Sequence, residues 1–377
     1  MDLVKLVHRG LSLREFALAA ARAVRPAVPF DGVCVLTFDP ATLLPTSEVT
    51  ENALPEAAFP RMTEIEVAEV DFNKFVDLAR ASRPAASLSE ATEGDLDRSL
   101  RQREVRRPNG WLGDELRAAL VNESATWGGI TLLRDAGPAF TPADVRFLSS
   151  LSRHLAEGIR LSVLLTAVTQ APAEVDAGLL VLAADNSIEM ANAAAQRWLD
   201  ELGTRGTNGG PLPSVVQAVA SRARSAAARN VEGDASARAR IRTPSGQWLL
   251  VRGSMLGDPA DERAAVILEA AQPPHLAPLI ADAHGFTERE RLVTQLVAQG
   301  LSTSEIANRL HISPYTVQDH LKSIFDKAGV STRGELVAHM FFTHYAPRLT
   351  SGTPIEPTGW FAPTPTSEPA TTRDRTA

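Results

Sequence analysis

Residues 286–340 read FTERERLVTQLVAQGLSTSEIANRLHISPYTVQDHLKSIFDKAGVSTRGELVAHM, and this stretch decides the fold of the C-terminal part of the chain. A hydroxyl residue followed three positions later by glutamate predicts a helix start, because the two side chains satisfy free backbone N–H groups. Such pairs are Thr287 with Glu290, Ser302 with Glu305, and Thr332 with Glu335. Ser313 before Pro314 marks a further start, and Gly300 and Gly329 suit helix ends. The stretch therefore predicts four short helices.

The third of these helices has one apolar side and one polar side. At about 100° per residue, the apolar side collects Val317, Leu321, Ile324 and Ala328, and the polar side collects Tyr315, Gln318, Asp319, Lys322 and Asp326. Gln, Asp and Lys side chains can hydrogen-bond the base edges in a DNA groove. The helix before it, residues 303–310, joins it through the tight segment His311 and Ile312, which is a helix-turn-helix arrangement. The alternative is a small helical bundle with a polar outer face.

Four runs in the stretch, TERER, VAQGLSTSEIA, ISPYTVQDHLK and KAGVSTRGEL, resemble the DNA-binding domain of LuxR-type transcriptional regulators without gaps. The resemblance implies an all-α, four-helix domain over residues 285–345 that binds double-stranded DNA. It implies that Gln318, Asp319 and Lys322 face the bases, and it places near phosphates Thr303, Ser313, Tyr315, Thr316, Lys327 and Arg333. It also implies a homodimer paired through the last helix, from Arg333 to about 342, and would admit RNA polymerase as a further partner.

The balance of charge in this stretch is less favourable to DNA binding. Between residues 285 and 345 six basic residues (Arg289, Arg291, Arg309, Lys322, Lys327 and Arg333) meet six acidic ones (Glu288, Glu290, Glu305, Asp319, Asp326 and Glu335), in a chain of net charge −7. Many LuxR-type relatives carry a base where this chain has Gln318. A neutral domain attracts a polyanion weakly, so we expect a shallow salt dependence and reliance on dimerisation. The same balance supports an alternative, a ligand-binding or scaffold protein whose helix-turn-helix makes protein contacts.

The whole chain of 377 residues has room for two or three domains. Its one cysteine, Cys34, excludes a disulfide framework and fits a reducing cytoplasm. The N-terminus has no apolar segment typical of a secretion signal. No uninterrupted apolar run reaches the length of about 18 residues that a membrane helix needs, so no membrane contact is expected. Of 38 basic residues only four are lysines, which indicates a GC-rich bacterial genome.

Residues 10–168 predict an α/β (α+β) domain. A helix is expected at 13–24, a buried strand at 32–39, further strands at 116–123 and 127–134, and then one long helix that begins at Thr141 and Pro142. This order, and the run FTPADVRFL after the last strand, resemble a GAF domain. GAF-like domains bind small molecules or dimerise without one, so the resemblance allows an unknown small-molecule effector. No cofactor is identified.

Several side chains in this domain have two interpretations. His154 could ligate haem but is more often a surface or packing residue, and Cys34 could sense oxidants but has no basic neighbour in its run to lower the thiol pKa. An arginine cluster could face an anion, although such runs are usually solvated; it comprises Arg98, Arg101, Arg103, Arg106 and Arg107. Residues spaced by three or four on the long helix could form a seam between two chains: Leu148, Leu151, Leu155, Ile159, Ser162 and Leu165.

Residues 174–271 predict a second α/β (α+β) domain. Strands are expected on both sides of a turn at Asp185 and Asn186, and later in the runs GQWLLVRGSMLG and RAAVILEAA, with a further turn at Ser245 and Gly246. Helices are expected from near Asn192 and over 215–229. The run DNSIEMANAAA and the paired last strands resemble a PAS domain. Met190, Trp198 and Trp248 could line a pocket, although such positions more often belong to a core.

Two other segments join and end these domains. Residues 272–284 are expected to form a linker, and the Pro- and Thr-rich residues 346–377 a disordered tail. Trp360 and Phe361 in that tail could form a docking motif or be a chance apolar pair.

Missing motifs exclude other functions. A nucleotide-binding loop ends in Gly-Lys, but the lysines of this chain follow Val, Asn, Leu and Asp. No HExxH, CxxC or GxSxG run supports a zinc site or a hydrolase, and the acid set of a phosphoacceptor domain cannot be assembled. Both tyrosines lie in the C-terminal stretch, which disfavours a lactone receptor. We expect no catalytic residue and no metal. The sequence therefore predicts a cytoplasmic, non-enzymatic transcriptional regulator with two sensor-like domains before its helix-turn-helix.

Overall fold

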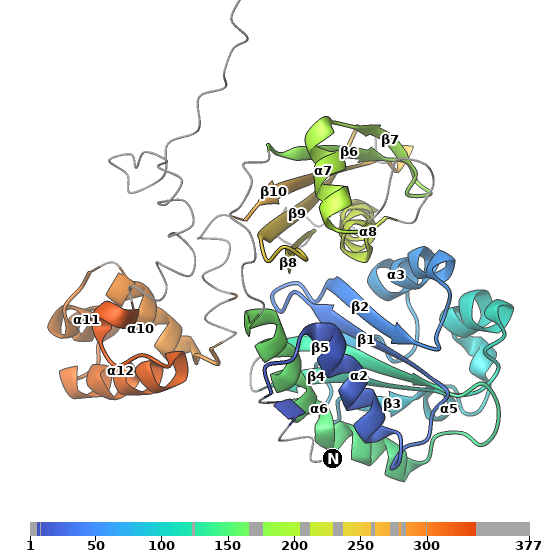
Figure 1. Ribbon diagram of the computed structural model, residues 1–377, viewed down its shortest axis with the longest axis horizontal. Helices are drawn as coiled ribbons and strands as arrows, with labels where there is room; N and C mark the ends of the chain where they lie inside the picture. The colour runs from blue at the N-terminus through green and yellow to red at the C-terminus, as the bar shows by residue number, and fades with distance from the viewer. Residues whose placement is uncertain are drawn as a thin grey trace, which may run out of the picture.

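The computed structural model of the chain describes residues 6–7, 9–122, 125–165, 176–203, 212–228, 237–257, 261–271, 279, 284–298 and 300–336. They form two antiparallel five-stranded sheets with helices packed on them, and a C-terminal group of helices (Figure 1). We call these the first unit (residues 9–165), the second unit (176–271) and the C-terminal unit (284–336). The predicted tail at 346–377, most of the predicted linker, and the fourth helix beyond residue 336 lie outside the described residues.

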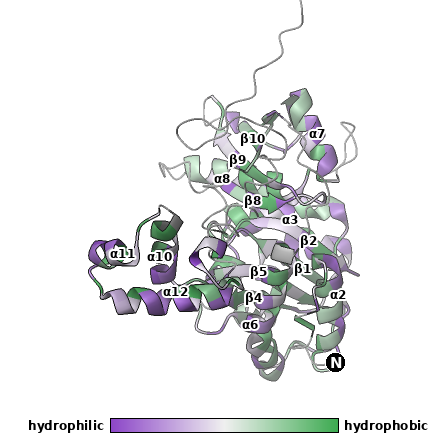
Figure 2. Ribbon diagram, turned by 60° about the vertical axis from the view of Figure 1, so that its left-hand side comes forward, coloured by the Kyte–Doolittle hydropathy of each residue, from purple (hydrophilic) through white to green (hydrophobic). Residues whose placement is uncertain are grey.

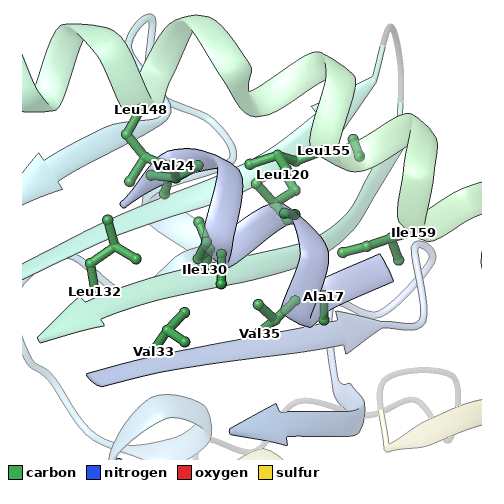
Figure 3. Close-up of a cluster of buried hydrophobic side chains, with 14 of the residues drawn as sticks. Ala17, Val24, Val33, Val35, Leu120, Ile130, Leu132, Leu148, Leu155 and Ile159 are labelled. Atoms are coloured by element: carbon green, nitrogen blue, oxygen red, sulfur yellow. The ribbon is translucent and has the colours of Figure 1, made fainter. Parts of the chain in front are cut away.

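The first sheet has the strand order β2-β1-β5-β4-β3. Its strands are β1 (Gly32–Phe38), β2 (Pro45–Glu51), β3 (Ala85–Ser87), β4 (Glu115–Asn122) and β5 (Ala125–Leu133). Helices α2 (Leu13–Val24) and α6 (Pro142–Leu165) cover one face of this sheet, and apolar side chains from both fill the space between (Figure 3). A complete capping box between Ser12 and Glu15 starts α2 where the periodicity predicts.

The apolar side of helix α6 packs against this core. Leu148, Leu155 and Ile159 are buried against the sheet, and Ser162 is buried as well. The predicted seam between two chains is therefore wrong for these residues, because the same spacing of three and four also fits packing on a sheet. His154 lies exposed on the outer side of α6, as a surface histidine would.

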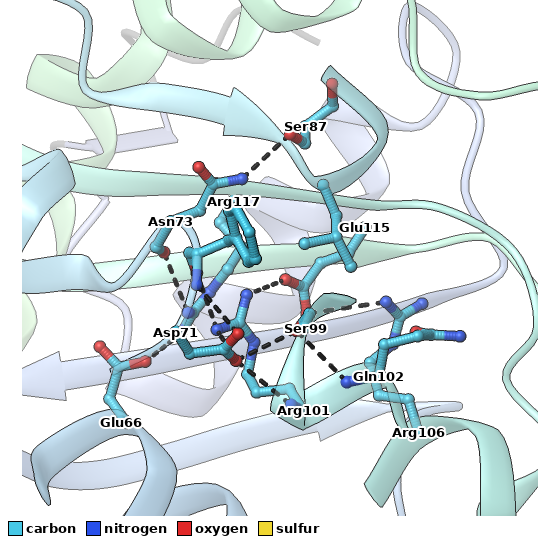
Figure 4. A network of polar contacts seen from close by, with 12 residues as sticks. Glu66, Asp71, Asn73, Ser87, Ser99, Arg101, Gln102, Arg106, Glu115 and Arg117 are labelled. Atoms are coloured by element: carbon cyan, nitrogen blue, oxygen red, sulfur yellow. Dashed lines mark hydrogen bonds and ion pairs between the residues drawn. The ribbon is translucent and has the colours of Figure 1, made fainter. Parts of the chain in front are cut away.

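The other face of the first sheet carries short helices and a buried polar network. The helices are α3 (Phe59–Ala68), α4 (Phe75–Leu78) and α5 (Leu88–Ala91), followed by helical turns at Leu96–Arg98, Arg101–Arg106 and Arg107–Asn109; a further turn, Glu56–Ala58, precedes α3. The arginine cluster divides here. Arg101 and Arg106 are fully buried near Glu115 (Figure 4), so the expectation of a solvated run is wrong for these two and holds for the exposed Arg98, Arg103 and Arg107.

The second sheet has the strand order β7-β6-β10-β9-β8. Its strands are β6 (Gly178–Leu182), β7 (Ile188–Ala191), β8 (Arg238–Arg242), β9 (Trp248–Met255) and β10 (Ala264–Ala270). Helices α7 (Ala193–Glu201) and α8 (Ser214–Ala228) pack on one face, and Asn192 caps α7 as predicted. Asn186 and Gly246 have the positive φ values of 64° and 92° that their turns require.

The three side chains proposed for a pocket in the second unit do not meet. Trp198 is buried in the core, Met190 is 63% exposed, and Trp248 packs against the core of the first unit. The pocket interpretation is therefore wrong, and the core interpretation holds only for Trp198. The two units pack on each other through α8, which contacts α3 and β2. Leu44 and Val67 of the first unit join the core of the second.

The C-terminal unit comprises α10 (Glu288–Ala298), α11 (Thr303–Leu310) and α12 (Pro314–Ala328), followed by the first helical residues of the predicted fourth helix. Its own apolar cluster includes Phe286, Val293, Ile306 and Leu336. Among the described residues of the whole chain, no helix is long and apolar enough to cross a membrane.

Candidate nucleic-acid interface

Side-chain caps set the starts of the C-terminal helices. Ser302 Oγ accepts from the backbone N–H of Glu305, whose carboxylate accepts from Ser302 N at 2.7 Å. The same reciprocal pair joins Thr287 and Glu290. The third pair differs, because the carboxylate of Glu335 accepts from Ser331 N, one residue before Thr332. The predicted caps are thus confirmed for α10 and α11. At the last helix Thr332 Oγ1 accepts from Glu335 N at 3.0 Å as predicted, and only the bond of the Glu335 carboxylate goes to Ser331 N instead of Thr332 N.

The turn between α11 and α12 depends on one backbone conformation. His311 ends α11 with φ 54° and ψ 46°, a left-handed conformation uncommon for a residue that is not glycine. Ile312 N then donates to Ala307 O at 3.0 Å, and Ser313 caps α12 directly afterwards. The sequence located this turn, but no glycine marked its left-handed residue.

Helix α12 presents the two predicted sides. Val317 and Ile324 are completely buried and Leu321 is 8% exposed, whereas Gln318, Asp319 and Lys322 are all exposed. Figure 2 shows hydrophilic and hydrophobic residues alternating along this helix. Lys322 forms no ion pair with any described residue, so its ammonium group is free to meet a partner. A helix with a fixed apolar back and a polar front can enter a groove.

The residues predicted near phosphates fall into two groups. Ser313, Tyr315 and Thr316 lie together at the N-terminal end of α12, where Ser313 Oγ accepts from Thr316 N at 3.0 Å and Tyr315 is 72% exposed. Thr303 is the first residue of α11. Helix N-termini offer backbone N–H groups to anions, so this group has suitable chemistry.

Lys327 and Arg333 form the second group, and their charged ends contact the unit itself. Lys327 Nζ donates to Glu290 Oε2 at 2.8 Å and to Gly285 O at 2.9 Å. Arg333 Nη2 donates to Leu301 O. A phosphate would have to compete with these contacts, and for both residues the phosphate role stays a prediction.

Glu290 is the residue whose role the sequence revealed only in part. Its carboxylate accepts from Ser323 Oγ at 2.6 Å and from Lys327, so it ties α10 to α12 as well as capping α10. Burial would raise the pKa of Glu290, but the hydrogen bonds from Lys327, Ser323 and Thr287 N outweigh burial and lower that pKa to about 2. The capping pattern identified Glu290, while its link to residues more than thirty positions away has no local signal.

Comparison with known proteins decides the family. The profile of "Bacterial regulatory proteins, luxR family" matches residues 284–340. The spore germination protein GerE of Bacillus subtilis is 41% identical over 54 residues, which are 14% of this chain and 73% of GerE. The chain belongs to the LuxR family. The match lies on the C-terminal unit and covers α10, α11 and α12 completely.

Other LuxR-family matches are confined to the same part of the chain. Mb0914c of Mycobacterium bovis is 49% identical over 51 residues, 14% of this chain and 6% of that protein. The transcriptional regulatory protein UhpA of Escherichia coli is 46% identical over 55 residues, 15% of this chain and 28% of UhpA. This LuxR-family chain therefore spans only a small part of these two relatives.

The similarity of this chain to one solved structure is distant. The VqsR LBD domain from Pseudomonas aeruginosa covers 43% of this chain and 93% of its own at 13% identity, with a TM-score of 0.31. A TM-score this low adds nothing to the description of the two sheets.

Proposed function

We propose that this LuxR-family chain is a DNA-binding transcriptional regulator that reads duplex DNA with α12. The observation that carries the proposal is the exposed front of α12, with Gln318, Asp319 and Lys322, over a buried apolar back. Gln can pair with adenine, Asp accepts from cytosine, and Lys reaches guanine or phosphate. The N-terminal ends of α11 and α12, with Thr303, Ser313, Tyr315 and Thr316, then position the helix on the backbone.

The N-terminal units supply control in this proposal. We assign residues 10–168 to a GAF-like and 174–271 to a PAS-like sensor domain, each with an antiparallel sheet and helices, followed by the DNA-binding domain at 285–345. The DNA-binding units of two copies can be presented in two arrangements. An effector or partner that binds the sensor half shifts the populations of these arrangements, and so changes how the two copies present α12 to half-sites about one helical turn apart. The chain then acts as a cytoplasmic homodimer, with RNA polymerase as a further partner and no catalytic step.

Selection of binding sites from a random duplex library tests the proposal. The full chain should enrich one two-fold symmetric motif, and Lys322→Ala should weaken or abolish the enrichment. Arg14→Ala removes the same charge from an exposed position on α2 and serves as the matched control, with enrichment unchanged. If neither the native chain nor its residues 280–346 alone enrich a motif, the regulator proposal fails.

A second candidate rests on the charge of the C-terminal unit. Its six bases and six acids cancel, and Lys327 is already paired with Glu290, so little positive charge remains to attract DNA. A scaffold protein that uses the helix-turn-helix for protein contacts would show this balance. Absence of any selected duplex, together with a folded C-terminal unit, would favour it.

A further inference from the structure

Lys327 lies in the last turn of α12 and is bound to α10 and to the residues before α10. Its Nζ donates to Glu290 Oε2 at 2.8 Å and to Gly285 O at 2.9 Å. The carbonyl oxygen of Lys327 lies 3.4 Å from the ring Nδ1 of His284. Two of the three N–H donors of the ammonium group are thus used inside the C-terminal unit.

The carboxylate that binds Lys327 also binds a second position on α12. Glu290 Oε1 accepts from Ser323 Oγ at 2.6 Å, while Oε2 accepts from Lys327 and from Thr287 N, the latter at 2.6 Å. Ser323 and Lys327 are four residues apart, so they lie one turn apart on the same side of the helix. The Glu290 side chain is 5% exposed, and its cap holds it at the start of α10. The two contacts therefore fix α12 against α10 along its axis and in rotation about it.

The side of α12 that meets Glu290 lies next to its exposed front. At about 100° per residue, Ser323 lies about 100° around the helix from Lys322, and Lys327 about 80° from Asp319. Apolar packing of the back of α12 is not directional, whereas hydrogen bonds require narrow angles. The contacts to Glu290 thus restrict the rotation that apolar packing alone permits, and any rotation of α12 turns its front by the same angle.

The place of Lys327 separates it from the groups proposed to contact phosphates at the start of α12. Twelve positions separate Tyr315 from Lys327, about 18 Å along the helix, and a recognition helix contacts base edges with its N-terminal residues. Glu290 lies in the first turn of α10 and Lys327 in the last turn of α12. The dipoles of the two helices favour these charges at these ends, so the pair is stabilised without DNA.

We propose that Lys327 is a positioning residue for DNA recognition, which acts through Glu290 by fixing the rotation of α12 and makes no phosphate contact. This inference rests on the proposed DNA-binding function. It departs from the phosphate role that the family resemblance implies, because loss of Lys327 then changes the choice of sequence and leaves the general attraction to DNA as it was.

Binding of the full chain to the selected motif and to an unrelated duplex, measured by fluorescence anisotropy at several salt concentrations, separates the two roles. Lys327→Met keeps an unbranched stem and removes the ammonium group. The affinity for the motif should fall about tenfold, as for the loss of one base contact. The affinity for the unrelated duplex and the salt dependence should stay unchanged. A phosphate contact would instead weaken both duplexes alike and lower the slope of log affinity against log salt by about 0.9, and that result would overturn the proposal.

A matched control separates position from charge. Arg289→Met removes the same charge from an exposed position of α10 and should leave the ratio of the two affinities unchanged. If Lys327→Met changes that ratio no more than Arg289→Met does, the proposal fails.

Variants at the partner residues show whether Lys327 acts through Glu290. Ser323→Ala removes the second contact without a change in charge and should weaken binding to the motif alone. Glu290→Gln should reproduce the effect of Lys327→Met, and the double variant should lose no more than either single variant, because the two residues act as one unit. Lys327→Arg, which can still pair with Glu290, should retain the preference for the motif. Additive losses in the double variant would overturn the proposal.

Loss of folding is distinguished from loss of position by circular dichroism of each variant. A role in folding alone predicts equal losses on both duplexes, which would overturn the proposal; if Lys327→Met does not fold, the uncharged Ser323→Ala decides in its place. If neither the native chain nor its residues 280–346 select a motif, the regulator and this inference fail together. If a motif is selected but the preference for it does not depend on Lys327, only this inference fails.

Discussion

Arg240 of β8 forms a two-point ion pair with Asp39, which follows β1, and so fastens the second unit to the first. Arg240 Nε donates to Asp39 Oδ2 at 2.9 Å and Nη2 to Oδ1 at 2.6 Å, while the backbone N of Arg240 also donates to Oδ2 at 2.8 Å. The side chains are 1% exposed for Asp39 and 9% for Arg240. A bidentate pair fixes orientation as well as distance, so the two units are held in one arrangement.

Removal of Asp39 should therefore be costly. In Asp39→Ala the guanidinium of Arg240 stays buried without its carboxylate, and breaking one partner of a buried pair typically costs about 3–5 kcal/mol of unfolding free energy. Chemical denaturation of the full chain measures this loss. As a control, Glu51→Ala breaks the half-exposed pair of Glu51 with Arg25 and should cost less than about 1 kcal/mol. Equal losses of unfolding free energy in the two variants would show that the buried Asp39 pair stabilises the chain no more than the half-exposed Glu51 pair does.

Contacts of this kind set the limit of what the sequence revealed. The caps of α10 and α11, the two sides of α12 and the bounds of α2 follow from residues three or four positions apart, so a local pattern predicts them. Asp39 and Arg240 are separated by 201 positions, and no such pattern links them. Their pairing depends on how the two sheets meet.

The burial of Arg101 and Arg106 was also not predicted, because their partners lie far away in the sequence. Arg101 finds Asp71 and Glu115 at distances of 30 and 14 positions, so the run of arginines alone suggests a solvated surface. Strand β2 was missed because its residues, PTSEVTE, are polar; it pairs with β1 at the edge of the sheet and is only partly buried. Edge strands carry little apolar periodicity.

Lys322 and Tyr315 should have different effects on DNA binding. Lys322→Ala should lower the affinity for the selected motif by about 1–3 kcal/mol and relax the preference at one position, because a base contact is lost. Tyr315→Phe should weaken all sequences to a similar, smaller extent, because a phosphate contact carries no sequence information. Fluorescence anisotropy on the selected motif and on single-base variants separates these outcomes. A uniform loss in Lys322→Ala would move that residue from the bases to the backbone.

Glu290 should make the C-terminal unit sensitive to acid. Its folded pKa of about 2 lies below the ordinary value of 4.5, so the stability it contributes is complete above pH 4.5 and is lost as the pH falls through the folded pKa. In Glu290→Gln this contribution is absent at every pH. We therefore expect the difference in unfolding free energy between the native chain and Glu290→Gln to shrink steadily from pH 5 to pH 2. A difference that does not change with pH would contradict the ionic link to Lys327.

Gly158 should prove indispensable to the contact between α2 and α6. A Cβ at this position would lie 1.9 Å from Cζ of Phe16, whose ring is buried against α6. Because the ring is enclosed by the core, it cannot simply turn aside, and overpacking of this kind typically costs about 1–3 kcal/mol. Gly158→Ala should therefore lower the unfolding free energy, although alanine favours helix formation. The helical Gly334 offers a matched control, since the closest atom to its added Cβ is 3.9 Å away, and Gly334→Ala should stabilise its helix slightly. If Phe16→Leu restores the stability of Gly158→Ala, steric conflict with the ring is the cause. Without such rescue, the loss of unfolding free energy would have to arise from changed contacts between α6 and the sheet below it.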